Sequence, residues 1–259
     1  MKKILTMVLC LALALSAAGC GNEIPDSELS RIVGEAILSD NSGSYLKGEC
    51  VGEGHRILGS RASAGQLKVY ALTMYGNYGF QNDMFVKVSG SGVIPAVLTF
   101  ETNGAENKLI EIEYPLDGAG YTESIKRMFP LKYRSAALNG ENAFNELKEQ
   151  EQSYAAKYLQ SIGRRAEIGE FGDLKVVLLT DVGISIDVSN RLSCDKNLGS
   201  YPFWIGSEEY LDNGIRYVRS LSYDKEAGQI IFCTVEKETD LITERFVFDA
   251  ATGAPISAG

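Results

Sequence analysis

Histidine is the functional residue that this sequence has least of, because its 259 residues include only His55. A zinc protease of the histidine type needs two histidines on one helix face, and an imidazole site for a transition metal needs a pair. The sequence excludes both classes, so we expect no metal site and no cofactor. His55 stands beside Gly52, Glu53 and Gly54. It is either a catalytic base or, as we prefer, a structural residue whose hydrogen bonds are satisfied.

Short catalytic motifs are missing too: the chain has no GxSxG elbow, no P-loop and no GxGxxG. Ser44-Tyr45-Leu46-Lys47 matches the SxxK of penicillin-binding enzymes and Ser39-Asp40-Asn41 matches their SDN. These two occur in reversed order, however, and no KTG follows. A carboxylate pair for glycoside hydrolysis stays open, since two acids need not be close in sequence. We predict no catalytic residues; an envelope hydrolase without a local motif is the alternative.

Cysteine is scarce beyond position 20, where only Cys50, Cys194 and Cys233 remain. An odd number leaves at least one thiol free or paired with another chain, and no CxxC occurs. Export permits disulfides, so a bridge between Cys194 and Cys233 stays open. Small buried free thiols are the interpretation that we prefer.

Long apolar runs are confined to the N-terminus, where Ile4 to Ala18 is almost unbroken. Lys2 and Lys3 precede this run, and the small residues Ser16-Ala17-Ala18-Gly19 lead to Cys20. This is the lipoprotein variant of a signal peptide. We predict a signal peptide over residues 1–19, cleavage between Gly19 and Cys20, and lipid on Cys20. An ordinary secretion signal is one alternative; a transmembrane helix is another, although the run is shorter than the roughly 20 residues it needs.

Basic charge is also low, with 25 Lys+Arg against 34 Asp+Glu. Without Lys2 and Lys3 the counts are 23 against 34, a net charge of -11. Nucleic acid and anionic headgroups would repel such a body. We therefore expect no nucleic-acid partner, and attachment through lipid on Cys20 to the extracytoplasmic side of the cell membrane. Whether a small ligand or another envelope protein is the partner stays open.

The pattern of residues predicts an α+β fold of antiparallel sheets with a few helices. After a lipidated tether at residues 20–25, a helix begins at Asp26 or Ser27 and ends at Asn41 and Gly43. Runs of branched and aromatic residues predict strands, and apolar stripes at helical spacing predict helices. The predicted strands are 69–75, 84–88 and 96–100, and the predicted helices are 121–129, stopped by Pro130, and 141–162.

The remainder of the chain predicts an antiparallel β-meander. Its expected strands are 174–180, 183–188, 215–223, 229–236 and 242–248. Asp212-Asn213-Gly214 is a tight turn signal. Two further turns are expected where Asp224 precedes Gly228 and where Asp249 precedes Gly253. We infer two units: an α+β sensor-like unit at 26–165 and a β-rich unit at 166–259.

One stretch is unusually aromatic, with Tyr75, Tyr78 and Phe80 among glycines. Tyrosines on a glycine-rich hairpin can form a recognition surface. The other interpretation, which we prefer, is that alternate aromatics face the core and the rest cover the sheet.

Residues 45 to 130 carry a family resemblance. The segments concerned are Gly48-Glu49-Cys50, Gly54-His55-Arg56-Ile57-Leu58-Gly59, Tyr75-Gly76-Asn77-Tyr78-Gly79-Phe80, Ile94-Pro95-Ala96-Val97-Leu98-Thr99-Phe100 and Ser124-Ile125-Lys126-Arg127-Met128-Phe129-Pro130. They resemble an extracytoplasmic region of Firmicutes found in small lipoproteins and at the C-terminal end of membrane metallopeptidases related to the β-lactam sensor–transducers. The tail, residues 246–256, resembles the closing strand and turn of PepSY-type domains.

The resemblance implies a sensing or binding module and brings no catalytic residues, because the metallopeptidase motif belongs to a membrane part that is missing here. Together with the lipoprotein signal, it predicts a non-enzymatic, lipid-anchored binding or sensory module at the cell envelope. An inhibitor or chaperone-like partner of another envelope protein is a further alternative.

Overall fold

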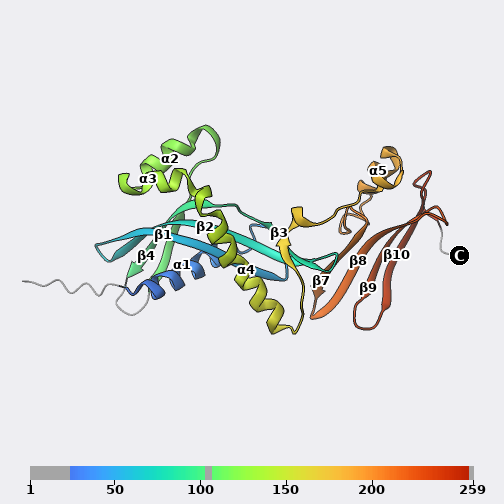
Figure 1. The fold of residues 1–259 in the computed structure, drawn as a ribbon, viewed down its shortest axis with the longest axis horizontal. Helices are drawn as coiled ribbons and strands as arrows, with labels where there is room; N and C mark the ends of the chain where they lie inside the picture. Colours follow the sequence, from blue (N-terminus) through green and yellow to red (C-terminus); the bar gives the residue numbers. More distant parts are fainter. Residues whose placement is uncertain (1–23, 103–106, 257–259) are drawn as a thin grey trace, which may run out of the picture.

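The computed structural model describes residues 24–102 and 107–256 (Figure 1). The predicted signal peptide, its cleavage site at Gly19 and the lipidation site Cys20 lie outside the described residues. The described residues form an α+β fold, as predicted, with one open sheet of ten strands. No helix among them is long and apolar enough to span a bilayer.

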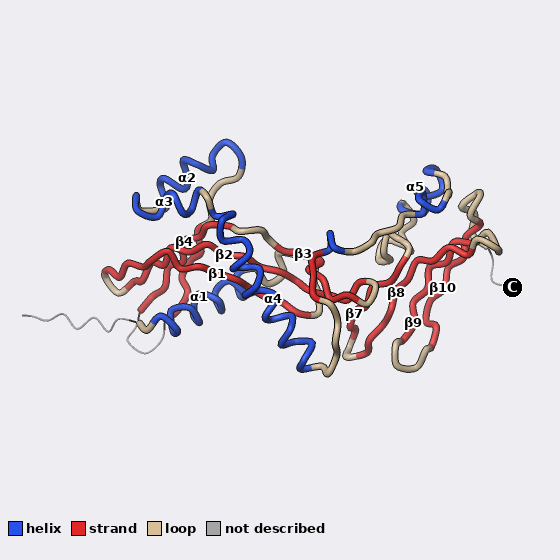
Figure 2. The backbone as a smooth tube through the Cα atoms, viewed as in Figure 1, coloured by secondary structure: helices blue, strands red, loops and turns tan. Residues whose placement is uncertain are grey.

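The helices are α1 (Asp26–Asp40), α2 (Tyr121–Met128), α3 (Leu131–Leu138), α4 (Phe144–Ser161) and α5 (Ile186–Ser193). The strands are β1 (Cys50–Ser63), β2 (Gln66–Gln81), β3 (Met84–Gly90), β4 (Ile94–Thr102), β5 (Asn107–Glu113), β6 (Ile168–Glu170), β7 (Gly206–Asp212), β8 (Ile215–Asp224), β9 (Gln229–Glu236) and β10 (Leu241–Asp249). All strand pairs are antiparallel except β3 with β6. Figure 2 shows the strands running along the molecule, with α1–α4 around one half and α5 on the other.

The first half of the fold, which comprises α1–α4 and β1–β5, has three layers. Helix α1 packs its apolar face on one side of β2 and β4, against Val69, Ala71 and Leu98. Helices α2, α3 and α4 cover the opposite side, where Tyr70 and Leu72 point. Successive strand residues face opposite sides, so β2 is buried along both faces over almost its whole length.

Glycines bring α4 close to the edge strand β1. A Cβ atom on Gly52 or Gly54 would clash with a backbone carbonyl oxygen of α4, that of Glu151 or of Leu147. A Cβ atom on Gly76 of β2 would clash with the Glu151 carboxylate. The glycine-rich sequence here therefore serves close helix–strand packing rather than turns.

The second half is the predicted meander of β7–β10, covered on one face by α5 and its flanking loops. Asn213 and Gly214 have positive φ angles of 49° and 82°, which confirms the predicted tight turn between β7 and β8. The turns at Asp224 and Asp249 are confirmed as well, because each Asp accepts backbone N–H groups two and three residues later.

The strands predicted at 174–180 and 183–188 are wrong. Residues 179–182 form a 3-10 turn that Gly183 ends at φ 91°, and residues 186–193 form α5. Ser185 caps this helix by accepting a hydrogen bond from the Val188 N–H at 3.3 Å. The branched residues of this stretch belong to an amphipathic helix with Val188 and Leu192 buried. Helix α3, which the sequence analysis did not predict, directly follows Pro130.

Cys50, Cys194 and Cys233 are free thiols, so the bridge between Cys194 and Cys233 is not formed. The expectation of buried thiols is wrong: Cys194, the C-cap residue of α5, is exposed, and Cys50 and Cys233 are half-buried. Strand β6 follows the boundary predicted near residue 166 and pairs with β3 of the first half. The division into units 26–165 and 166–259 stays a prediction.

Candidate functional site

The aromatic residues predicted to offer a recognition surface are buried. Tyr75 is 3% exposed, and Tyr78 and Phe80 are 0% exposed. The reason is that helices cover both faces of β2, so alternation along the strand leaves no solvent side. Their proposed role as an exposed surface is therefore corrected: Tyr78 and Phe80 pack in one core cluster with Phe85.

The Tyr78 hydroxyl serves a buried polar network instead. It donates to Glu151 Oε1 at 2.8 Å, and Lys87 Nζ lies 2.9 Å from Glu151 Oε2. Burial raises the pKa of Glu151, whereas the hydrogen bonds and charge of Lys87, and the bond from Tyr78, oppose that rise. Each polar group has a partner, so this network explains packing between β2, β3 and α4 rather than binding.

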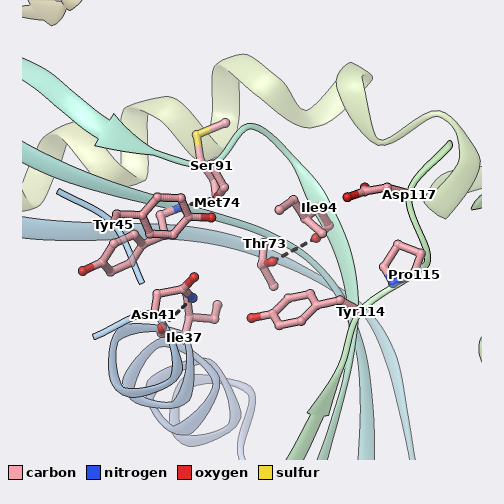
Figure 3. Close-up of a pocket in the computed structure, with 11 residues that line it drawn as sticks. Ile37, Asn41, Tyr45, Thr73, Met74, Ser91, Ile94, Tyr114, Pro115 and Asp117 are labelled. Carbon is pink, nitrogen blue, oxygen red and sulfur yellow. Dashed lines mark hydrogen bonds between the residues drawn. The ribbon is translucent and has the colours of Figure 1, made fainter. Parts of the chain in front are cut away.

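A small pocket lies where α1 meets the first half of the sheet (Figure 3). Its cavity measures about 190 Å³. Tyr45 stacks on Tyr75 with ring centroids 5.6 Å apart, and the Thr73 hydroxyl donates to the Ile94 carbonyl at 2.9 Å. The pocket is smaller than a typical ligand site of 300–1,000 Å³.

A larger cavity, which we name the junction groove, lies where the two halves of the sheet join. It measures about 790 Å³. The halves connect here through the backbone pair of Gln81 and Glu208. The groove is lined by residues 46–49, 199–204 and 208–211, and by Gly79, Gln81, Val88, Phe171 and Arg219.

The rim of the junction groove is apolar. Trp204 is buried, and its ring packs edge-on against Phe171 and Phe203, with centroids 5.2 and 4.9 Å apart. Phe203 is 64% exposed, and Leu46, which also lines the groove, is exposed too. Exposed large apolar groups beside a concave surface are typical of a binding site.

The inner wall of the groove is polar. Gln81 Nε2 donates to Glu208 Oε2 at 3.4 Å, and the Arg219 guanidinium lies 3.8 Å from the centroid of the Tyr210 ring. Burial raises the pKa of the Glu208 carboxyl, and the hydrogen bond from Gln81 and the charge of Arg219 only partly oppose this.

Three buried polar atoms have no hydrogen-bond partner among the described residues: Gln81 Oε1, Trp204 Nε1 and Arg219 Nε. All three belong to residues that line the junction groove. Buried polar groups are nearly always paired in folded proteins, so such a concentration calls for a functional explanation. The sequence analysis missed this site; its one signal was the sole tryptophan in Tyr201-Pro202-Phe203-Trp204.

His55 lies at a second polar cluster, on β1 between α1 and α4. Its Nε2 lies 2.8 Å from Ser30 Oγ of α1, and its Nδ1 lies 2.8 Å from Glu53 Oε2. The Tyr154 hydroxyl of α4 donates to Glu53 Oε1 at 2.9 Å. His55 is 9% exposed and Glu53 is 4% exposed. The hydrogen bonds of His55 are thus satisfied, but the sequence analysis did not anticipate the serine.

Among the described ranges, 24–102 and 107–256, no group of three or more His, Cys, Asp or Glu residues could hold a metal ion. Comparisons with protein-family models, with curated proteins and with solved structures found no match.

Proposed function

We propose that this protein is an extracytoplasmic lipoprotein that binds a ligand in the junction groove, as a binding or sensory module of the cell envelope. The observation that supports this most is the meeting of three unpartnered buried polar atoms behind an exposed aromatic rim. Each of these groups costs about 1–3 kcal/mol while it has no partner. A ligand that offers hydrogen-bond donors and acceptors would relieve this cost when the lining side chains turn these atoms toward the groove.

The position of the groove suits a sensor. Its walls come from β2 and β3 of the first half and from β7 and β8 of the second. A ligand held by both halves would favour one relative arrangement of them, and a partner at the envelope could respond to that arrangement. The proposal is therefore a binding module rather than an inhibitor or chaperone-like partner, which stays the alternative.

Trp204 fluorescence can report binding in the junction groove, because Trp204 lines the groove and is the only tryptophan in the chain. Purified peptidoglycan fragments and short peptides should be titrated while Trp204 emission is followed. Gln81→Met removes the unpartnered acceptor with little change in volume, and Phe203→Ala removes the exposed rim. Both should weaken binding at least tenfold.

Gln66→Met is the matched control, since Gln66 is an exposed glutamine at the other end of β2. This variant should bind like the parent. Equal binding by the Gln81 and Gln66 variants would remove the groove from the proposal, and so would a panel of probes that leaves Trp204 emission unchanged.

The anchor has a separate test. Cys20→Ser should abolish labelling by radioactive fatty acid and release the protein into the medium or leave it uncleaved. A variant that stays membrane-bound and fully processed would contradict the lipoprotein proposal, whatever the groove binds.

The alternative of a hydrolase without a local motif is favoured by one independent observation, the hydrogen-bonded series Ser30–His55–Glu53.

A further inference from the structure

Two elements bring a serine, a histidine and a carboxylate into line. Glu53 and His55 alternate along β1, so both side chains point to the same face. Helix α1 packs on that face and presents Ser30 from its second turn. Gly34 follows Ser30 by one turn, and a Cβ atom there would lie 2.6 Å from Glu53 Oε1. The glycine therefore lets the carboxylate approach the helix.

Donor and acceptor roles can be assigned along the series of hydrogen bonds from Tyr154 to Ser30. The Tyr154 hydroxyl donates to Glu53 Oε1, because burial and the nearby Glu53 charge raise the pKa of Tyr154 and keep its phenol protonated. A carboxylate oxygen accepts hydrogen bonds, so we assign the ring proton of His55 to Nδ1, which lies 2.8 Å from Glu53 Oε2. With this tautomer, His55 Nε2 accepts a hydrogen bond from the Ser30 hydroxyl, whose Oγ lies 2.8 Å away. This is the arrangement in which an imidazole acts as a general base toward a serine.

The cluster is held in place before any substrate arrives. The His55 backbone N–H, on the outer edge of β1, donates to Gln150 Oε1 of α4 at 2.9 Å. His55 and Glu53 are thus fixed by α1, β1 and α4 together. Ser30 itself is half-buried and borders an open depression of about 450 Å³.

The same depression reaches the first turn of α1. The N-cap residue of α1 is Pro25, which provides no side-chain hydrogen bond. The first N–H groups of a helix lack intrahelical partners and favour negative charge, so they suit a developing oxyanion. Ser27 lines the depression one turn before Ser30. Arg31, which also lines the depression, is already paired with Glu28 and Glu35, so it does not attract an anionic substrate.

We propose that Ser30 is a nucleophile with His55 as its general base, and that its substrate is a neutral or cationic carboxylic ester. Ser30 Oγ bonds to the ester carbonyl carbon while its proton moves to His55 Nε2. The ester C–O bond then breaks, and the same proton passes to the departing alkoxide, which leaves as an alcohol. Water attacks the acyl–Ser30 ester in the same way, releasing the carboxylic acid and restoring the serine.

Glu53 and Tyr154 are positioning residues that act through the imidazole. The site stands apart from the junction groove, since the two share no lining residue. The inference therefore does not depend on the proposed function.

A small fluorophosphonate and p-nitrophenyl acetate test the proposal, followed by intact mass and peptide mapping of the full chain. We expect one adduct, on Ser30. Ser30→Ala should lose it, and His55→Gln should slow its formation by about 100-fold or more. Ser39→Ala, at an exposed serine near the other end of the same helix and outside the depression, should label like the parent. An unlabelled folded parent, an adduct elsewhere, or equal labelling of Ser30→Ala would overturn the proposal.

A second measurement, the tautomer of His55 in the parent protein, does not depend on the stability of any variant. Because His55 is the only histidine, ¹⁵N resonances of its imidazole in the parent are unambiguous. The neutral ring should carry its proton on Nδ1, and Glu53→Gln should change that tautomer balance while Ser39→Ala leaves it unchanged. A proton on Nε2 in the parent would mean that Ser30 accepts rather than donates, and would overturn the role of His55.

Discussion

Arg216 of β8 pairs with both carboxylate oxygens of Glu49, a residue 167 positions earlier in the chain. The Nη1–Oε1 distance is 2.5 Å and the Nη2–Oε2 distance is 3.0 Å. Arg216 also contacts Glu209 at 3.0 Å, and Glu209 pairs with Arg164 of the first half and with Lys237. Two carboxylates and three cations thus join the halves of the sheet beside the junction groove.

The first prediction concerns this ion-pair cluster. Arg216→Met should lower the free energy of unfolding by about 3 kcal/mol, because the Glu49 side chain is only 4% exposed and would lose its cation. Arg31→Met is the matched control, since Arg31 also pairs with two glutamates but is exposed. Its loss should lower the free energy of unfolding far less than the loss of Arg216, because water screens exposed ion pairs. Urea denaturation of both variants checks the prediction, and equal losses would contradict it.

The second prediction concerns the buried aromatics. Tyr78→Ala should destabilise the fold by about 3–5 kcal/mol, because the ring is fully buried and its hydroxyl serves Glu151. Phe203→Ala should change stability by only about 0.5 kcal/mol, because that ring is mostly exposed. Thermal melts of the two variants distinguish them. A Tyr78→Ala variant as stable as Phe203→Ala would show that β2 is not covered on both faces.

Local patterns in the sequence predicted much of the fold. The branched and aromatic runs of β2, β3 and β4, the apolar stripe of α4 and the Asn213-Gly214 turn each have a periodicity or turn chemistry of their own. The strand prediction for residues 174–180 is wrong because a short apolar run is not specific for a strand. In the structure Leu174 is buried, whereas Val177 is exposed.

The candidate sites depend on contacts that no local pattern encodes. Ser30 meets His55 only because α1 docks on β1 at one particular position. The junction groove needs Gln81 beside Glu208, a pairing across 127 residues. Such contacts follow from tertiary packing, so residue spacing alone could not predict them. Gly34 inside a helix and the sole Trp204 were the available signals.

A third prediction concerns the turn between β7 and β8. Gly214→Ala should cost about 1 kcal/mol or more, because Gly214 has a φ angle of 82° and a Cβ atom is strained there even though no atom lies nearby. Gly92→Ala is the control, since Gly92 also has open space around it but no positive φ angle. Thermal melts should show a loss for the first variant alone. A loss of the same size in both would contradict the prediction, because the lower entropy of the unfolded chain favours folding in both variants and only Gly214 has the positive φ angle.

The last prediction concerns Glu151, which is 0% exposed. Burial raises its pKa in the folded state, although Lys87 and Tyr78 favour the charged form. Between the ordinary carboxyl pKa of the unfolded chain and this raised value, the folded state holds a proton that the unfolded state has lost. The contribution of Glu151 to the free energy of unfolding is thus full below that window and falls as pH rises through it. Glu151→Gln cannot titrate and should lack this fall, whereas Glu146→Gln, an exposed glutamate on the same helix, should keep it. Urea denaturation at a series of pH values from mildly acidic to neutral gives the curves, and a parent curve parallel to that of Glu151→Gln would contradict the raised pKa.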